Sequence, residues 1–161
     1  MIVLKTQTIT TENLLLGPFV MKDAEAVYSG WATDKAVTRW MRWPTHRSVE
    51  DSRRAVEHWL KTYRDGSEAN WAIRRRADGV LMGSIGVFPA GEDFDGAGLE
   101  VGYCLGRAFW GNGYATEALC AVAGYMKEET ETPLLVCMHA TENVASARVI
   151  EKAGFTYTHE G

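Results

Sequence analysis

FWGNGYATEAL, residues 109–119, places two glycines around an asparagine where a predicted strand is followed by a predicted helix. The residues before it, LEVGYCLG at 99–106, are typical of a strand, and the run after Gly113 favours a helix. The amides at a helix N-terminus are unpaired and partly positive, and glycine lets an anion come close to the backbone. The turn therefore predicts either a diphosphate cradle built from backbone amides or simply a tight bend.

Two familiar phosphate-binding motifs do not fit this turn. A P-loop needs GK[ST], which is missing here, and a dinucleotide fingerprint needs a third glycine and an early strand. A plain nucleotide-binding domain stays open as an alternative, and it predicts affinity for ATP or NAD.

The composition bounds the class of protein. The 161 residues fit one domain over 1–161, and 46% hydrophobic with 24% charged residues is ordinary for a globular chain. A net charge of −4 argues against a nucleic-acid partner. Cys104, Cys120 and Cys137 form neither a disulfide framework nor a CxxC pair, so we expect the cytoplasm and no metal. No signal peptide is visible and no apolar run approaches the roughly 18–20 residues of a membrane span, so we expect no membrane partner.

Hydrophobic periodicity and turn residues predict a mixed α/β order of β-αα-βββ-α-β-α-β, with a helix crossing between neighbouring strands late in the chain. Ser48 and Asp51 predict a helix start, and Gly66 predicts its end. The expected strands are 13–20, 69–76, 80–90, 97–106, 133–140 and 155–160, and the expected helices are 22–33, 34–44 (a short helix or turn), 48–66, 114–129 and 142–154.

Three segments resemble the GNAT superfamily of N-acetyltransferases, and within it the RimJ/RimL-like branch. TENLLLGPFVMKDAEAVY (11–28) resembles the opening strand and helix, EVGYCLGRAFWGNGYATEAL (100–119) the acetyl-CoA motif, and ENVASARVIEKAGF (142–155) the second motif. The resemblance implies the acyl-CoA N-acyltransferase fold, a mixed and mostly antiparallel sheet with splayed strands, flanked by helices. The family usually continues past GF for two closing strands, so we expect the last strand to be dispensable or an edge to come from a second copy in a homodimer.

The resemblance also implies where acetyl-CoA binds. The family loop Q/R-x-x-G-x-G/A falls on Trp110, Gly113 and Ala115, and in the family the backbone amides of this turn bind the pyrophosphate. A backbone N–H of the preceding strand polarises the thioester carbonyl, and Asn143 matches an asparagine that contacts CoA, although Asn is also a favoured helix cap. The implied cofactor residues are Tyr103, Cys104, Leu105, Trp110, Gly111, Asn112, Gly113, Tyr114, Ala115, Thr116, Asn143 and Ser146.

For catalysis, Glu100 matches a frequent glutamate of the branch and is our candidate general base, acting directly or through water; a strand glutamate paired with an arginine is the alternative. Ser146 matches the serine of the branch and is the candidate acid for the thiolate, unless it only satisfies the helix start and water serves instead. Related enzymes outside the branch carry a tyrosine where Ile150 stands. His139 is a second candidate base on the acceptor side, and His46 a weaker one.

The acceptor end is marked by RWMRWP, residues 39–44, which borders the acceptor site in the family. Trp40 and Trp43 would clamp an amine by cation–π contact, or they pack the core. Without an emphatic base the site suits a low-pKa amine, because near pH 7.4 deprotonating a lysine costs roughly 4 kcal/mol and an α-amine under about 1. The prediction is an acetyl-CoA-dependent N-acetyltransferase that moves an acetyl group to a primary amine, a protein N-terminal α-amine or a small-molecule amine, by direct attack in a ternary complex. The alternative is a non-catalytic acyl-CoA sensor or partner subunit.

Overall fold

The computed structural model describes residues 4–39, 41, 43–89, 98–129, 135–137 and 144–152. Six strands and five α-helices lie in these ranges, joined by two 3₁₀ turns and one π-helix. In chain order they are β1 (Ile9–Thr10), β2 (Leu14–Gly17), a 3₁₀ turn (Met21–Asp23), α1 (Ala24–Val27), a π-helix (Tyr28–Ala32), α2 (Lys35–Thr38), α3 (Val49–Asp65), β3 (Ala69–Arg75), β4 (Leu81–Pro89), β5 (Leu99–Leu105), a 3₁₀ turn (Arg107–Phe109), α4 (Tyr114–Glu129), β6 (Leu135–Cys137) and α5 (Val144–Lys152). None of the helices in the described ranges is long and apolar enough to cross a membrane.

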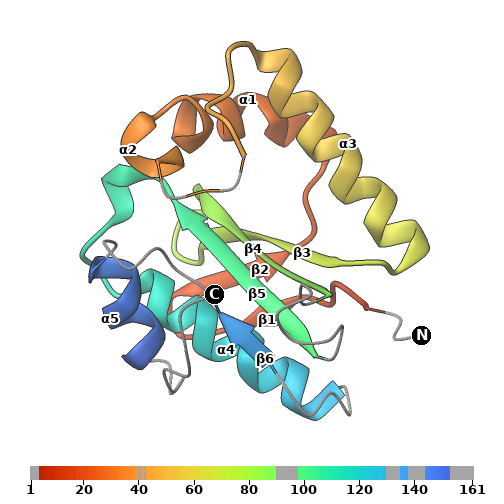
Figure 1. Cartoon of the computed structure of the whole chain (residues 1–161), viewed down its shortest axis with the longest axis vertical. Helices are drawn as coiled ribbons and strands as arrows, with labels where there is room; N and C mark the ends of the chain where they lie inside the picture. The colour runs from red at the N-terminus through yellow and green to blue at the C-terminus, as the bar shows by residue number, and fades with distance from the viewer. Residues whose placement is uncertain are drawn as a thin grey trace.

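The strands form one sheet in sequence order, and α1, α2 and α3 cover one face while α4 and α5 cover the other (Figure 1). Neighbours from β1 to β5 are antiparallel, and β6 lies parallel to β5 across α4. A parallel neighbour needs a crossover connection, so α4 is the crossing helix that the sequence predicted. The expected strand at 155–160 lies outside the described residues.

The start of the chain differs from the prediction in three places. The two-residue strand β1, with Ile9 opposite Leu16, was not predicted. The expected strand at 13–20 ends early, because Pro18 has no N–H to continue the ladder. The expected helix at 22–33 is broken into a 3₁₀ turn, α1 and a π-helix. These short elements bring the Gly30 carbonyl close to Gly106, at the end of β5.

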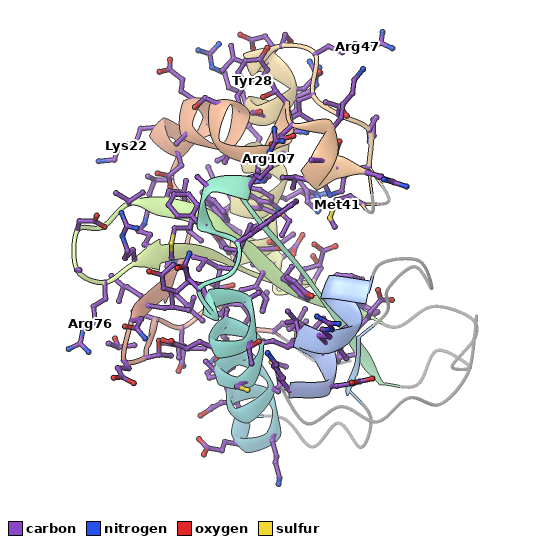
Figure 2. The ribbon with its side chains drawn as sticks, turned by 90° about the vertical axis from the view of Figure 1, so that its left-hand side faces the viewer. Lys22, Tyr28, Met41, Arg47, Arg76 and Arg107 are labelled. Atoms are coloured by element: carbon purple, nitrogen blue, oxygen red, sulfur yellow. The ribbon has the colours of Figure 1, made fainter. Side chains whose placement is uncertain are left out.

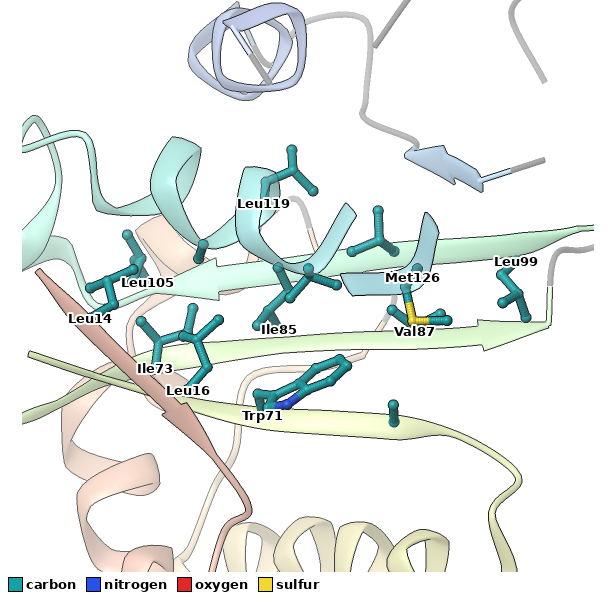
Figure 3. Packing of buried hydrophobic residues seen from close by; sticks show 14 of the residues in the cluster. Leu14, Leu16, Trp71, Ile73, Ile85, Val87, Leu99, Leu105, Leu119 and Met126 are labelled. Carbon is teal, nitrogen blue, oxygen red and sulfur yellow. The ribbon is translucent and has the colours of Figure 1, made fainter. Parts of the chain in front are cut away.

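The larger core lies between the sheet and α4 (Figure 3). Alternate residues of β3, β4 and β5 point toward it, among them Trp71, whose indole N–H donates to the Gln7 carbonyl at 2.7 Å. Helix α4 turns one apolar stripe toward this core: Ala118, Leu119, Val122 and Met126 are buried and Ala115 is half-buried. A second core lies on the other face of the sheet, under α1 and α3. Ala72 and Cys104 contribute to it from the sheet.

Helix α3 begins after Ser48 and ends at Gly66, as the sequence predicts. Gly66 has the left-handed φ of 70° that glycine favours, and its N–H donates to the Thr62 carbonyl at 2.9 Å. At the other end Ser48 is the N-cap residue, but its side chain accepts no capping bond. Asp51 accepts from the Arg47 N–H at 2.9 Å and also from the Ser48 N–H.

Candidate functional site

The glycine turn has the backbone that only glycine adopts readily. Gly111 and Gly113 have φ values of 81° and 79°, and a Cβ on either would meet no atom within 4 Å. The requirement for glycine in this structure is therefore conformational, and the space in front of the turn is open. Helix α4 begins at the next residue, Tyr114, and the amides of its first turn have no partner within the helix. The turn and the helix end can accept an anion.

Hydrogen bonds from two side chains fix the backbone conformation of this turn. The Asn112 amide donates to the carbonyls of Phe109 and Trp110, both at 3.2 Å. The Trp110 indole N–H donates to the Leu105 carbonyl at 2.9 Å, while the ring itself is 47% exposed. The polar groups of Asn112 and Trp110 are bonded within the protein and position the turn. The backbone amides are therefore the donors that the turn offers to a ligand. The residues present fit a diphosphate cradle.

The β3–β4 hairpin supports the start of α4. This contact was not predicted from the sequence. The Arg75 guanidinium lies over the Phe109 ring, 5.7 Å from its centroid, and donates to Asp78 at 2.7 Å. It also hydrogen-bonds the Tyr114 hydroxyl, and the bond to Asp78, followed by that to Tyr114, raises the pKa of Arg75. The side chain of Tyr114 therefore anchors the start of α4 to the sheet.

Strand β5 lies between β4 and β6 in the sheet. The whole strand pairs with β4, and the described residues of β6 pair with Leu99, Glu100 and Val101. Tyr103, Cys104 and Leu105 stand at the end of β5 that leads toward the glycine turn. The separation of the two strands that the family resemblance implies falls on residues after Cys137, outside the described ranges.

Cys104 has an inert thiol. Its Sγ lies 3.3 Å from the Ser84 Oγ on β4, and burial raises the pKa of the Cys104 thiol to about 11. A thiol that stays protonated near neutral pH is a poor nucleophile. The buried thiol of Cys104 is therefore a poor candidate for carrying an acyl group.

Glu100 is a buried acid on the face of the sheet that carries α1 to α3. It is 5% exposed and lies opposite Phe88 on β4 and Val136 on β6. Side chains alternate along a strand, so Glu100 shares the face of Cys104, which packs in the core under α1 and α3. Tyr103, with Leu105, faces the α4 side instead.

Trp43 and His46 belong to the loop before α3, on the same side as Glu100. Trp43 is half-buried against the core under α1 and α3, and its ring lies 5.2 Å from that of His46. The His46 Nδ1 is 2.7 Å from the Oγ of the buried Ser52, and burial lowers the pKa of His46, which keeps the ring neutral near pH 7. A pocket of about 310 Å³ opens beside this loop, lined by Pro44, Thr45, His46, Arg47, Asp51 and Arg54.

The remaining predicted residues have the following places. Trp40, His139 and Asn143 lie outside the described residues. Ser146 lies in α5, whose backbone is described there while the Ser146 side chain is not. Ile150, at the tyrosine position of related enzymes, is buried in the core against α4, which leaves no hydroxyl at that place.

A mixed sheet in which β6 lies parallel to β5, with a glycine turn between β5 and the crossing helix α4, is the arrangement expected of an acyl-CoA N-acyltransferase fold. The family model of the GNAT acetyltransferase domain matches residues 13–156, and the chain belongs to this family. It is 28% identical over 145 residues to the uncharacterized N-acetyltransferase YoaA of Bacillus subtilis (strain 168), covering 90% of this chain and 80% of that protein.

Solved structures agree with this assignment. A GNAT-family acetyltransferase from Bacillus anthracis superposes with a TM-score of 0.79 at 26% identity, over 92% of this chain and 82% of that one. RimL, the ribosomal L7/L12 α-N-protein acetyltransferase, in complex with coenzyme A, also gives a TM-score of 0.79, at 19% identity over 93% and 84% of the two chains. At that identity the likeness shows the fold alone. The protein is an acetyltransferase of the GNAT family, and its neighbours in structure include a RimL enzyme.

Proposed function

We propose that this protein transfers the acetyl group of acetyl-CoA to a primary amine, with an N-terminal α-amine as the favoured acceptor. The observation that carries the proposal is the preformed turn from Gly111 to Gly113, which leads from β5 to the start of α4. The complex of RimL with coenzyme A supports the same donor class.

The donor half is built from backbone groups. Amides from Gly111 through Thr116 hold the diphosphate, because they converge at the positive end of α4 and glycine φ values keep them in place. The N–H of Tyr103 or Cys104 faces the acyl carbonyl and stabilises the negative charge that develops on its oxygen. The family resemblance assigns Asn143 and Ser146 of the second motif to the same donor site.

In the acceptor half, Glu100 removes the proton that the amine must lose. The amine nitrogen bonds to the acyl carbon, the bond from that carbon to sulfur breaks, and the released thiolate takes a proton from Ser146 or from water. Glu100 acts directly or through one water, from the face of β5 that also carries the core around Trp43. The protonated, buried thiol of Cys104 supports direct transfer rather than an acyl-enzyme.

An α-amine suits this site better than a lysine amine. Glu100 is a carboxylate base, and deprotonating a lysine amine near pH 7.4 costs roughly 4 kcal/mol. His46, in the acceptor-side loop, is held neutral by burial and stays the weaker alternative base, after His139. Trp43 supplies an aromatic wall on that side.

The test combines binding and turnover. Calorimetric titration with acetyl-CoA, CoA, ATP and NAD measures which ligand the cradle takes, and affinity for ATP or NAD alone would refute the donor assignment. Release of free thiol is then followed with a lysine-free peptide that has a free N-terminus and with an N-acetylated peptide that has one lysine. Faster turnover of the lysine peptide contradicts the acceptor assignment.

The Glu100→Gln variant tests the base. We expect kcat to fall by about 10²- to 10⁴-fold, the usual range for a general base, with the acetyl-CoA Kd within about twofold of wild type. Glu128→Gln, on the exposed side of α4, is the matched control and keeps wild-type turnover. A protein that binds acetyl-CoA and transfers to no amine would instead be a sensor or partner subunit.

The homodimer stays a prediction. Light scattering at micromolar concentration measures it, and a monomer would refute it.

A further inference from the structure

The end of β5 is in direct backbone contact with the π-helix that follows α1. The Gly106 N–H donates to the Met82 carbonyl at 2.8 Å, which fixes this residue against β4. A Cβ built on Gly106 would lie 2.8 Å from the Gly30 carbonyl oxygen, so no larger residue fits without moving one of the two segments. Short π-helical segments occur frequently at functional sites. This one lies against the residue that leads into the cradle turn.

An ion pair joins the same two segments beside that contact. The Arg107 Nε donates to the Asp34 Oδ2 at 2.9 Å, and the side chains are 63% and 21% exposed. Asp34 uses its other oxygen to accept the Ala36 N–H at 3.0 Å and so caps α2. Arg107 lies between the turn after β5 and the layer of α1 and α2 (Figure 2). One carboxylate therefore connects the start of α2 to the approach of the cradle.

The π-helix is also bonded to the loop that carries Trp43 and His46. The His46 N–H donates to the Ala32 carbonyl at 2.8 Å. Residues 28–39 and 43–47, the acceptor-side segment, thus contact the cradle approach through Gly106 and Arg107.

We infer that the contacts of Gly106 with Gly30 and of Arg107 with Asp34 form a joint that fixes the acceptor-side segment relative to the donor cradle. The inference rests on the proposed function, because the joint matters only if donor and acceptor meet across it. Arg107 and Asp34 are then positioning residues for the transfer, which is sensitive to displacements of about 1 Å. Binding at the cradle is transmitted to the acceptor-side segment through the joint.

Hydrogen exchange with coenzyme A as the probe tests this without an acceptor. In the wild type, saturating CoA slows amide exchange in residues 111–116 and, by about threefold, in the acceptor-side segment, including the His46 amide. In Arg107→Gln and in Asp34→Asn, which keeps a capping side chain, the slowing at 111–116 persists and that of the acceptor-side segment is mostly lost. The double variant behaves like either single one, because the two side chains act as one pair. Arg53→Gln breaks a surface pair with Glu50 on α3 and is the control that responds like the wild type.

A steric pair of variants tests the same joint independently of charge. Gly106→Ala must displace the Gly30 carbonyl, whereas Gly30→Ala meets no atom within 4 Å. We expect Gly106→Ala to uncouple the acceptor-side segment and Gly30→Ala to respond like the wild type. High salt weakens the effect of the exposed ion pair and leaves that of Gly106→Ala unchanged.

Three results would overturn the inference. One is slowing at 111–116 in the wild type with no response in the acceptor-side segment. The second is a full response of that segment in both the charge variants and Gly106→Ala. The third is additive losses in the double charge variant. If CoA slows exchange at neither place, the proposed function fails, and this inference fails with it.

Discussion

Replacing Gly113 by alanine isolates the conformational requirement of the cradle. A methyl group at this position meets no atom within 4 Å, so the change adds no clash. The only cost is the φ of 79°, and an L-residue in the left-handed region is less stable by about 1–2 kcal/mol. If the variant keeps the turn, this free energy is lost from the stability of the fold. If the turn relaxes, it is lost from the binding of acetyl-CoA.

Thermal unfolding and calorimetry together measure the whole free-energy cost of the substitution. Thermal unfolding reports the first part, and a loss of about 1 kcal/mol lowers the Tm of a domain of this size by roughly 2–4 °C. Calorimetry reports the second part, and a loss of about 1–2 kcal/mol raises the Kd for acetyl-CoA roughly 5- to 30-fold. We expect the two losses to sum to about 1–2 kcal/mol, with most of it in binding, because the open turn is free to relax.

Gly124→Ala is the matched control on the same helix. Gly124 is exposed within α4, and a Cβ there also meets no atom within 4 Å. Alanine in a helix interior stabilises by about 0.5–1 kcal/mol over glycine, so the Tm should rise while the Kd is unchanged. The reasoning is refuted if Gly113→Ala has the wild-type Tm and the wild-type Kd.

Three further predictions concern residues around the site. Cys104→Ala keeps its turnover, since burial raises the pKa of the thiol to about 11; loss of transfer with intact acetyl-CoA binding would contradict direct attack. Gly83→Ala fails to fold or loses much of its Tm, because its Cβ would lie 2.1 Å from the Cys104 carbonyl oxygen, and a wild-type melting curve would count against the β4–β5 geometry. Burial lowers the pKa of His46 below the unfolded value of 6.5, so the folded state resists protonation and its stability falls as the pH drops below about 6.5. His46→Asn should flatten that fall between pH 7.5 and 5.5, and a fall as steep as in the wild type would contradict the reasoning.

Much of the fold follows from local patterns. The apolar stripe of α4, the end of α3 at Gly66 and the strands β3 to β5 are set by side-chain period and by glycine, and the structure confirms them. The crossing helix between β5 and β6 also follows, because a strand, a helix and a strand in sequence favour a parallel pair. The cradle was predicted from the same kind of signal, since its two glycines interrupt a strand–helix junction.

Other features have no local signature. The strand β1 has two residues and pairs with the next strand, which leaves no run long enough to show a period. The division of 22–33 into three kinds of helical turn reflects the packing of this segment on β5, where Gly30 meets Gly106. The sequence placed the start of α3 at Ser48 correctly, but the Ser48 side chain makes no capping bond.

The sequence by itself therefore determined the family fold, the glycine turn and the helix on which it ends, because these depend on neighbours within a few positions. Only the tertiary structure decided that Cys104 is buried and inert, that Arg75 supports the start of α4, and that Arg107 reaches Asp34. These contacts join residues from 20 to 73 positions apart, as Ser84 with Cys104 and Asp34 with Arg107 show. Such pairs are selected by how layers pack on the two faces of the sheet, and no periodicity along the chain encodes them.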